Sequence, residues 1–171
     1  MRVTLDSTRR ILRSVFETIS IFLADMTSPL LILGFDYGTR RIGVACGNTL
    51  TQSARPLTTL MRGSQLPWND IAALVKEFSP AQFVVGLPYN MDGTETTLTP
   101  DVRAFAAALT ERFDKPVALV DERLSSRAAE ADLRDARAQG HKRKRVTHSD
   151  VDMAAAKVLV EQWLRALQPK L

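Results

Sequence analysis

The stretch from Leu30 to Ala45, LLILGFDYGTRRIGVA, constrains the fold more than any other part of the chain. Its apolar run, Leu30–Leu33, is short enough for one buried strand and leads towards Asp36. We predict a turn at Tyr37–Thr39 and a second strand that begins at Ile42. A carboxylate beside apolar residues at a strand end is costly unless a cation or hydrogen bonds compensate it. A plain hairpin with a solvated aspartate is the alternative, so a chemical role for Asp36 requires further carboxylates elsewhere.

The composition is typical of one globular domain: 171 residues, 45% hydrophobic and 25% charged. The single cysteine, Cys46, lies in a predicted strand and is expected in the core. A chain with one cysteine forms no internal disulfide, which agrees with a cytoplasmic protein. No apolar run reaches the roughly 20 residues that span a bilayer, so no membrane partner is expected. A net charge of +4 favours a polyanionic partner, although weakly.

Residues 1–28 differ from the rest and are predicted to be an N-terminal extension, peripheral or poorly ordered, before one domain at 29–171. Apolar residues recur there at helical spacing, with arginines on the other side. An organelle-targeting peptide is one alternative, but acidic residues interrupt the segment. A surface helix, a membrane-interface helix and an upstream start, with the domain beginning near Met26, are the others.

The remaining pattern predicts an α/β domain with a mixed five-stranded sheet flanked by helices. Further strands are expected at Ala54–Met61, Ala81–Pro88 and Val117–Val120, and helices at Leu66–Phe78, Thr99–Phe113, from Ser125 or Ser126 towards Ala136, and Asp150–Leu167. The first three strands are expected to be antiparallel, and the later ones parallel through helical crossovers. Pro56 favours an edge or bulged position for the third strand.

Carboxylates stand where three of these elements begin or end: Asp36, Asp121 with Glu122, and Asp150 with Asp152. Ligands of parallel sheets lie outside the carboxyl ends of the strands, and the last helix can bring Asp152 to the same edge. Gathered carboxylates repel one another unless cations are present, and hard divalent cations take oxygen ligands. Two such ions about 3.5–4 Å apart are the usual arrangement for in-line phosphodiester hydrolysis.

Each of these acids also has a purely structural interpretation. Asp152 lies three residues after Ser149 and could complete a capping box at the start of the last helix. Asp121 and Glu122 are adjacent, so in a regular strand only one of them faces the site. Arg123 could pair with either acid or bind a phosphate bidentately.

The basic run His141–Arg145 is predicted to be a loop before the last helix. As a nucleic-acid contact it would bind phosphates through Lys142, Arg143, Lys144 and Arg145, with an affinity that falls steeply with salt. Arg40 and Arg41 of the first hairpin could join that surface. A solvated loop without a ligand is the alternative.

Four blocks of the sequence, taken in order, resemble the signature blocks of the YqgF/RuvX family. They are Asp36–Ala45 (DYGTRRIGVA), Val85–Gly93 (VGLPYNMDG), Asp121–Ser126 (DERLSS) and Val151–Ala156 (VDMAAA). The resemblance covers about Leu30 to Leu167 and leaves residues 1–28 outside. It implies an RNase H-like fold, related to the RuvC Holliday-junction resolvases.

The resemblance also implies a metal-dependent nuclease with Mg or Mn as cofactor. By motif match, the catalytic acids are Asp36, Asp121, Glu122 and Asp152, with metal expected on Asp36, Glu122 and Asp152. Asn90 and Arg123 join the expected nucleic-acid-binding residues. The fourth-strand acid of the resolvase relatives is missing, because Gly86-Leu87-Pro88 stands there. The DER block replaces it and leaves Asp121 and Glu122 as alternatives, with the longer Glu122 favoured.

The family is usually assigned to 5′-end processing of pre-16S rRNA in the bacterial cytoplasm, and this is the function that we expect. A Holliday junction resolvase acting on four-way DNA is the first alternative, and a non-catalytic nucleic-acid-binding module is the second. The expected partner is therefore structured RNA or branched DNA. Resolvases act as dimers, but no dimer interface is readable, so a monomer or weak homodimer is expected.

Overall fold

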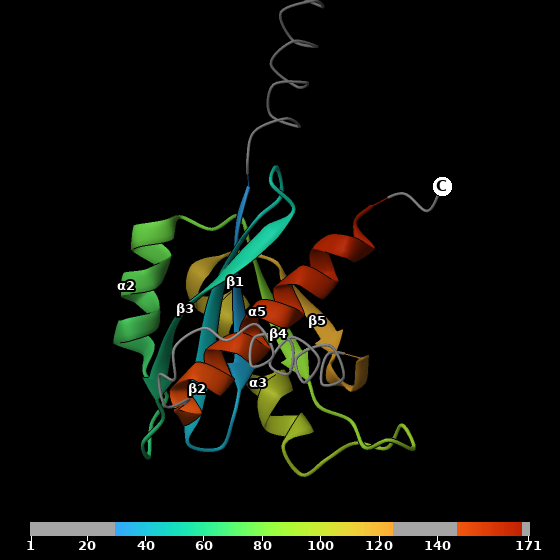
Figure 1. Ribbon diagram of the computed structural model, residues 1–171. Helices are drawn as coiled ribbons and strands as arrows, with labels where there is room; N and C mark the ends of the chain where they lie inside the picture. Colours follow the sequence, from blue (N-terminus) through green and yellow to red (C-terminus); the bar gives the residue numbers. More distant parts are fainter. Residues whose placement is uncertain (1–29, 125–146, 169–171) are drawn as a thin grey trace, which may run out of the picture.

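The structure is a computed structural model that describes residues 30–124 and 147–168 (Figure 1). The described elements are β1 (Leu31–Tyr37), β2 (Arg41–Asn48), β3 (Ser53–Met61), α2 (Trp68–Phe78), β4 (Gln82–Leu87), α3 (Thr99–Phe113), β5 (Val117–Asp121), the short 3₁₀ helix η1 (Glu122–Leu124) and α5 (His148–Ala166). The predicted extension at 1–28, the helix after Ser125 or Ser126 and the run His141–Arg145 lie outside the described residues. For these segments the sequence-based expectations stay predictions.

The five strands form one mixed sheet in the order β3-β2-β1-β4-β5. The pairs β1–β2 and β2–β3 are antiparallel, whereas β1–β4 and β4–β5 are parallel. This topology confirms the predicted fold class. The edge strand β3 also carries an irregularity beside Pro56, because Val44 pairs with Thr58 and Ala45 with Pro56, which leaves Leu57 unpaired.

Helices cover both faces of the sheet, and each face has its own core. On one face, α2 and α3 contribute Ile71, Phe105 and Leu109 to a cluster with alternate residues of β1, namely Leu33, Phe35 and Tyr37. Figure 1 shows α5 crossing the opposite face, where Ala156, Leu159, Val160 and Leu164 pack on Ile32, Ala45, Val84 and Val120. Because side chains alternate along a strand, Gly34 and Asp36 face α5.

Most element boundaries differ from the sequence prediction by one or two residues, and three of the differences affect the site or the helix starts. The strand β1 continues through Asp36 to Tyr37, and the turn is closed by the Gly38 amide donating to the Arg41 carbonyl at 2.9 Å. The helix α2 begins at Trp68 rather than Leu66, because Pro67 occupies the N-cap. The helix α5 begins at His148 rather than Asp150.

The start of α5 also corrects the predicted cap. Thr147, not Ser149, is the N-cap residue, and its hydroxyl accepts from the Asp150 amide while the Asp150 carboxylate accepts from the Thr147 amide at 2.8 Å. Asp150 is therefore the acid of the capping box. The capping interpretation of Asp152 was wrong, which leaves its carboxylate available for another contact.

Within the described ranges, no helix is both long and apolar enough to cross a membrane. Cys46 is buried in the core, as predicted.

Candidate active site

Asp36 is the centre of the candidate site and lies on the sheet face that α5 covers. In the β1–β2 ladder it is directly opposite Gly43. No lysine, arginine or histidine in the described part of the chain forms an ion pair with it. Burial and the nearby charge of Asp152 raise the pKa of Asp36 to about 6. The charged form of the Asp36 carboxylate is therefore energetically unfavourable in this environment.

Asp152 reaches this place because α5 lies directly on glycine. A Cβ atom at Gly43 would overlap the backbone oxygen of Asp152, so only glycine lets the first turns of α5 approach β2 this closely. The Thr59 hydroxyl donates to the Ser149 carbonyl at 3.0 Å and ties the same turn to β3. Asp152 therefore lies beside the cross-strand neighbour of Asp36. Its carboxylate Oδ2 accepts from Nε of Arg41 at 2.7 Å.

Glu122 enters the site from the end of β5. The strand stops at Asp121, and the chain turns into η1, which breaks the alternation of the two acids. A Cβ atom at Gly86 of β4 would overlap Oε1 of Glu122, so the carboxylate lies over that glycine. Burial, followed by the charges of Asp36 and Asp121, raises the pKa of Glu122 to about 7. Glu122 thus occupies the space above Gly86, within the Gly86-Leu87-Pro88 stretch where the family resemblance implied that an acid is missing.

Asp121 is used differently, as the partner of Arg123. The guanidinium Nε lies 3.0 Å from both carboxylate oxygens, Nη2 contacts Oδ2, and the Arg123 amide donates to Oδ1 at 3.0 Å. These hydrogen bonds hold the pKa of Asp121 below its usual range. Arg123 also lies 5.5 Å from the centre of the Tyr89 ring. Of the two interpretations of Arg123, the structure shows the ion pair.

Three acids are therefore brought to three neighbouring strands: Asp152 above β2, Asp36 on β1 and Glu122 above β4. Because Phe35 pairs with Val85, the next residues in each strand, Asp36 and Gly86, lie side by side. Carboxylate oxygens are hard ligands that suit a divalent cation, and burial and neighbouring acidic charges raise the pKa values of Asp36 and Glu122. In residues 30–124 and 147–168, no three or more Asp, Glu, His or Cys side chains stand close enough to hold one ion together. The carboxylate of Asp152 is engaged with Arg41 instead.

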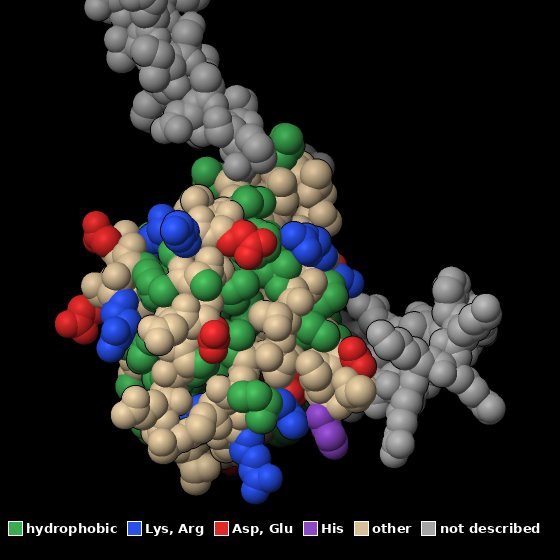
Figure 2. Space-filling view, turned by 90° about the vertical axis from the view of Figure 1, so that its left-hand side faces the viewer, with side chains coloured by type: hydrophobic (Ala, Val, Ile, Leu, Met, Phe, Trp, Pro, Cys, Tyr) green, Lys and Arg blue, Asp and Glu red, His purple; other side chains and the backbone are tan. Residues whose placement is uncertain are grey.

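The expected nucleic-acid-binding residues are spread around this centre. Arg40 is exposed in the β1–β2 turn. The Asn90 amide donates to Thr94 Oγ1 at 2.9 Å and to the Glu95 carbonyl at 3.2 Å, so this side chain closes the loop after β4. Lys142, Arg143, Lys144 and Arg145 lie outside the described residues. Figure 2 shows basic and acidic side chains interspersed on the face that it presents.

Sequence reasoning missed the residues that make room for the acids. The Glu122 carboxylate lies over Gly86, and Thr147 is the N-cap residue after which α5 begins. The sequence signal for Gly86 was a glycine within a buried apolar strand, which often marks the close approach of another group. For Thr147 it was a second Thr/Ser-x-x-Asp spacing, Thr147 with Asp150, two residues before the one favoured.

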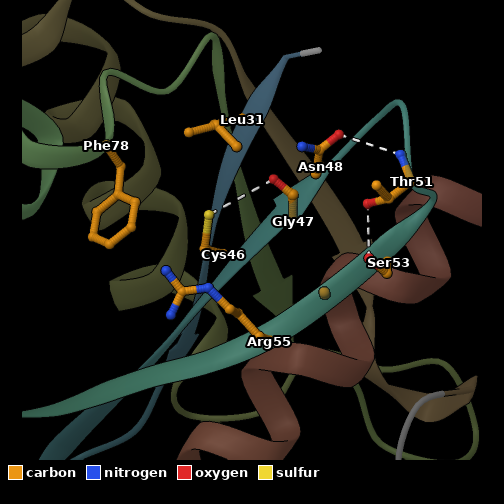
Figure 3. A pocket seen from close by; sticks show the side chains of 9 residues that line it. Leu31, Cys46, Gly47, Asn48, Thr51, Ser53, Arg55 and Phe78 are labelled. Carbon is orange, nitrogen blue, oxygen red and sulfur yellow. Dashed lines mark hydrogen bonds between the residues drawn. The ribbon is translucent and has the colours of Figure 1, made fainter.

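A separate cavity of about 280 Å³ lies at the other end of β1, between the start of β3 and the end of α2 (Figure 3). Its lining includes the buried Cys46, Asn48, Phe78 and Arg55, whose guanidinium lies 5.6 Å from the centre of the Phe78 ring. No carboxylate lines it. The cavity therefore differs from the acid cluster in the chemistry of its lining.

A mixed sheet with this strand order defines the class of protein as RNase H-like, and solved structures agree. The chain is similar to Thermus thermophilus RuvC in complex with a Holliday junction substrate, with a TM-score of 0.52 and 16% identity over 80% of this chain and 94% of RuvC. It is also similar to the Fowlpox virus resolvase in complex with Holliday junction DNA, with a TM-score of 0.53 and 10% identity over 82% of this chain and 100% of the resolvase. At such identities the likeness shows the fold alone.

Sequence comparison identifies the family. The RuvX family, described as Holliday junction resolvase, matches residues 30–166. A protein of Chromohalobacter salexigens named "Putative pre-16S rRNA nuclease" is 46% identical over 134 residues, which are 78% of this chain and 88% of the relative. A protein of the same name from Alcanivorax borkumensis is 54% identical over 100 residues, 58% of this chain and 75% of the relative. The chain belongs to the RuvX family.

Proposed function

We propose that the chain is a divalent-metal-dependent endonuclease that hydrolyses phosphodiester bonds in structured RNA, in 5′-end processing of pre-16S rRNA. One observation carries the proposal: Asp36, Glu122 and Asp152, which are distant in sequence, come to neighbouring strands on one face of the sheet. Two of them, Asp36 and Glu122, have pKa values raised by burial and by the charges of neighbouring acids, which is typical of functional carboxylates. A solvated surface cluster would not show such shifts.

Asp36, Glu122 and Asp152 are the residues that would hold the cofactor, and Mg or Mn fits their oxygen ligands. When bound, such a cation supplies activation of the attacking water and stabilisation of the leaving oxygen. The chain itself contributes the position of the acids. Glu122, with a pKa of about 7, can also exchange a proton at its carboxylate near neutral pH.

The ion pair of Asp121 with Arg123 fixes the end of β5, from which Glu122 projects. We therefore assign the metal role to Glu122 and a supporting role to Asp121. Glu122→Gln is expected to abolish cleavage while the protein stays folded. Asp121→Asn is expected to lower the free energy of unfolding and to retain part of the activity. Loss of cleavage in Asp121→Asn with full activity in Glu122→Gln would reverse the assignment.

Ribosomal RNA is the favoured substrate because the relatives at 46–54% identity carry the rRNA nuclease name over most of their length. This substrate would place the reaction in the cytoplasm. A Holliday junction resolvase is the second candidate, since the family description names that activity. Arg40, Asn90 and the run Lys142–Arg145 would contact the phosphate backbone of either substrate.

The test offers a pre-16S rRNA fragment, single-stranded RNA and a four-way DNA junction in parallel, each with Mg²⁺ or Mn²⁺. We expect cleavage near the 5′ end of the rRNA fragment that stops when EDTA is added. Symmetrical cuts in the junction alone, by a protein that light scattering shows to be a dimer, would favour the resolvase. Tight binding of nucleic acid without cleavage in either metal would indicate that the protein is a non-catalytic nucleic-acid-binding module.

A further inference from the structure

The contact between Arg41 and Asp152 is the feature of the site that the proposed function does not explain. It joins residues 111 positions apart, through one hydrogen bond from Nε to Oδ2 of 2.7 Å. Arginine–carboxylate pairs that stabilise a fold are commonly bidentate, as the pair of Arg123 with Asp121 is here. The Arg41 contact is monodentate, through Nε alone, and it is partly open to solvent because the side chains of Arg41 and Asp152 are 33% and 24% exposed. Such a contact is inexpensive to break.

Both partners keep unused capacity in this contact. Arginine has five N–H donors, and in residues 30–124 and 147–168 the terminal nitrogens of Arg41 donate to no other group. Oδ1 of Asp152 likewise accepts no hydrogen bond from these residues. Arg41 also stands next to Arg40 at the mouth of the β1–β2 turn, where a phosphate backbone could approach. The guanidinium can therefore serve a second anion if it leaves the first.

We propose that Arg41 is an exchangeable counter-ion: it neutralises Asp152 in the metal-free protein and turns to a substrate phosphate when a divalent cation takes over that carboxylate. The inference rests on the proposed function. Asp152 and Asp36 would then both contribute to holding the cation, in keeping with the charge of Asp152 already raising the pKa of Asp36. The negative charge of Asp152 would be neutralised before and after the exchange, and phosphate binding would be coupled to cation binding.

The proposed exchange predicts that removal of the Arg41 side chain strengthens cation binding and weakens RNA binding. In Arg41→Ala the cation no longer competes with a guanidinium, so the full-length protein is expected to bind Mn²⁺ about tenfold more tightly in calorimetry. The same variant is expected to bind an rRNA fragment several-fold more weakly in Ca²⁺, yet as well as the wild type in EDTA. A merely structural ion pair would weaken Mn²⁺ binding, because Asp152 would lose its orientation.

Two variants serve as controls. Arg40→Ala removes the same charge from the adjacent, exposed position and is expected to leave the Mn²⁺ affinity unchanged. Arg41→Lys keeps the charge and is expected to restore Mn²⁺ affinity to near the wild-type value; if Arg41→Ala does not fold, Arg41→Gln replaces it.

The outcomes separate the inference from the function on which it rests. Unchanged or weaker Mn²⁺ binding in Arg41→Ala, with clear binding by the wild type, overturns the exchange and leaves the nuclease proposal standing. An RNA affinity that falls equally with and without Ca²⁺ also overturns it. Failure of the wild type to bind Mn²⁺ at millimolar concentration overturns the proposed metal-dependent function together with the exchange.

Discussion

At the scale of single residues, the site consists of acidic side chains, two of which lie where their charged forms are energetically unfavourable. Asp36 and Glu122 are held where their charged forms are disfavoured by burial and by neighbouring acidic charges, that of Asp152 on Asp36 and those of Asp36 and Asp121 on Glu122. Asp121 and Asp152 each form an ion pair with an arginine. The unfavourable placement of Asp36 and Glu122 favours a role in cation binding, to which Asp152 would contribute the third carboxylate.

Asp36→Asn is expected to stabilise the metal-free fold at neutral pH. With a pKa of 3.8 unfolded and about 6 folded, the native state holds more protons between these values, so the Asp36 contribution to stability falls as pH rises through this window. The variant should therefore match the wild type near pH 4 and exceed it above pH 6, by at most about 3 kcal/mol. Urea unfolding in EDTA at a series of pH values measures the difference.

The matched control is Asp114→Asn, at the exposed C-cap of α3 in a left-handed conformation that asparagine also adopts readily. It should change the free energy of unfolding by less than about 0.5 kcal/mol at every pH. An Asp36→Asn variant that is less stable than the wild type at pH 7 would contradict the electrostatic description of Asp36.

At the scale of elements, glycine decides how closely α5 and η1 approach the sheet. Asp36 lies in a row across the sheet between Gly43 of β2 and Gly86 of β4, two positions without side chains. Asp152 lies over Gly43, and Glu122 lies over Gly86. The two glycines meet different atoms. Gly43 faces backbone, which cannot rotate away, whereas Gly86 faces the ends of the Glu122 and Leu159 side chains.

Gly43→Ala is therefore expected to lower the free energy of unfolding by about 2 kcal/mol or more, because α5 must shift away from β2. Gly86→Ala should cost less stability but should displace the Glu122 carboxylate and reduce cleavage strongly. Thermal unfolding and nuclease rates measured on the same preparations test the contrast. Gly63→Ala, where nothing lies within 4 Å of the added methyl, is the control for both. Equal losses of stability in Gly43→Ala and Gly86→Ala would contradict the distinction.

Capping of α5 is a second property of the element. Thr147→Ala removes the capping box and is expected to cost about 1 kcal/mol of stability, whereas Ser149→Ala should cost little. Chemical denaturation of the two variants compares them directly. A larger loss in Ser149→Ala would show that α5 begins where the sequence first suggested.

Sequence patterns predicted the elements well because they are local. The strand with Cys46, the edge strand with Pro56 and the helix Thr99–Phe113 follow from periodicity and proline placement, and all are found. The cap of α5 was misplaced because Thr147 with Asp150 and Ser149 with Asp152 have the same spacing. The contact of Arg41 with Asp152 and the seat of Glu122 above Gly86 depend on packing between distant segments, which spacing does not encode.

At the scale of the whole molecule, a net charge of +4 is small, so affinity for nucleic acid depends on where the basic residues lie. We expect that neutral replacements at Lys142–Arg145 weaken RNA binding and reduce the slope of log affinity against log salt by about one per lost phosphate contact. Filter binding between 50 and 200 mM salt, which are about the usual limits of such titrations, gives the slope. An unchanged slope would indicate that Lys142–Arg145 makes no phosphate contacts and is a solvated loop without a ligand.

The central claim about the whole molecule is that Asp36, Glu122 and Asp152 act together as one catalytic site. The most direct measurement is the single-turnover cleavage rate of the rRNA fragment in Mn²⁺ for Asp36→Asn, Glu122→Gln, Asp152→Asn and the double variant Asp36→Asn with Glu122→Gln. A joint site predicts that each single variant loses nearly all activity and that the double variant is no slower than the singles, because residues acting as a unit are not additive. Substantial cleavage by any single variant, or losses that multiply in the double variant, would contradict a shared metal site.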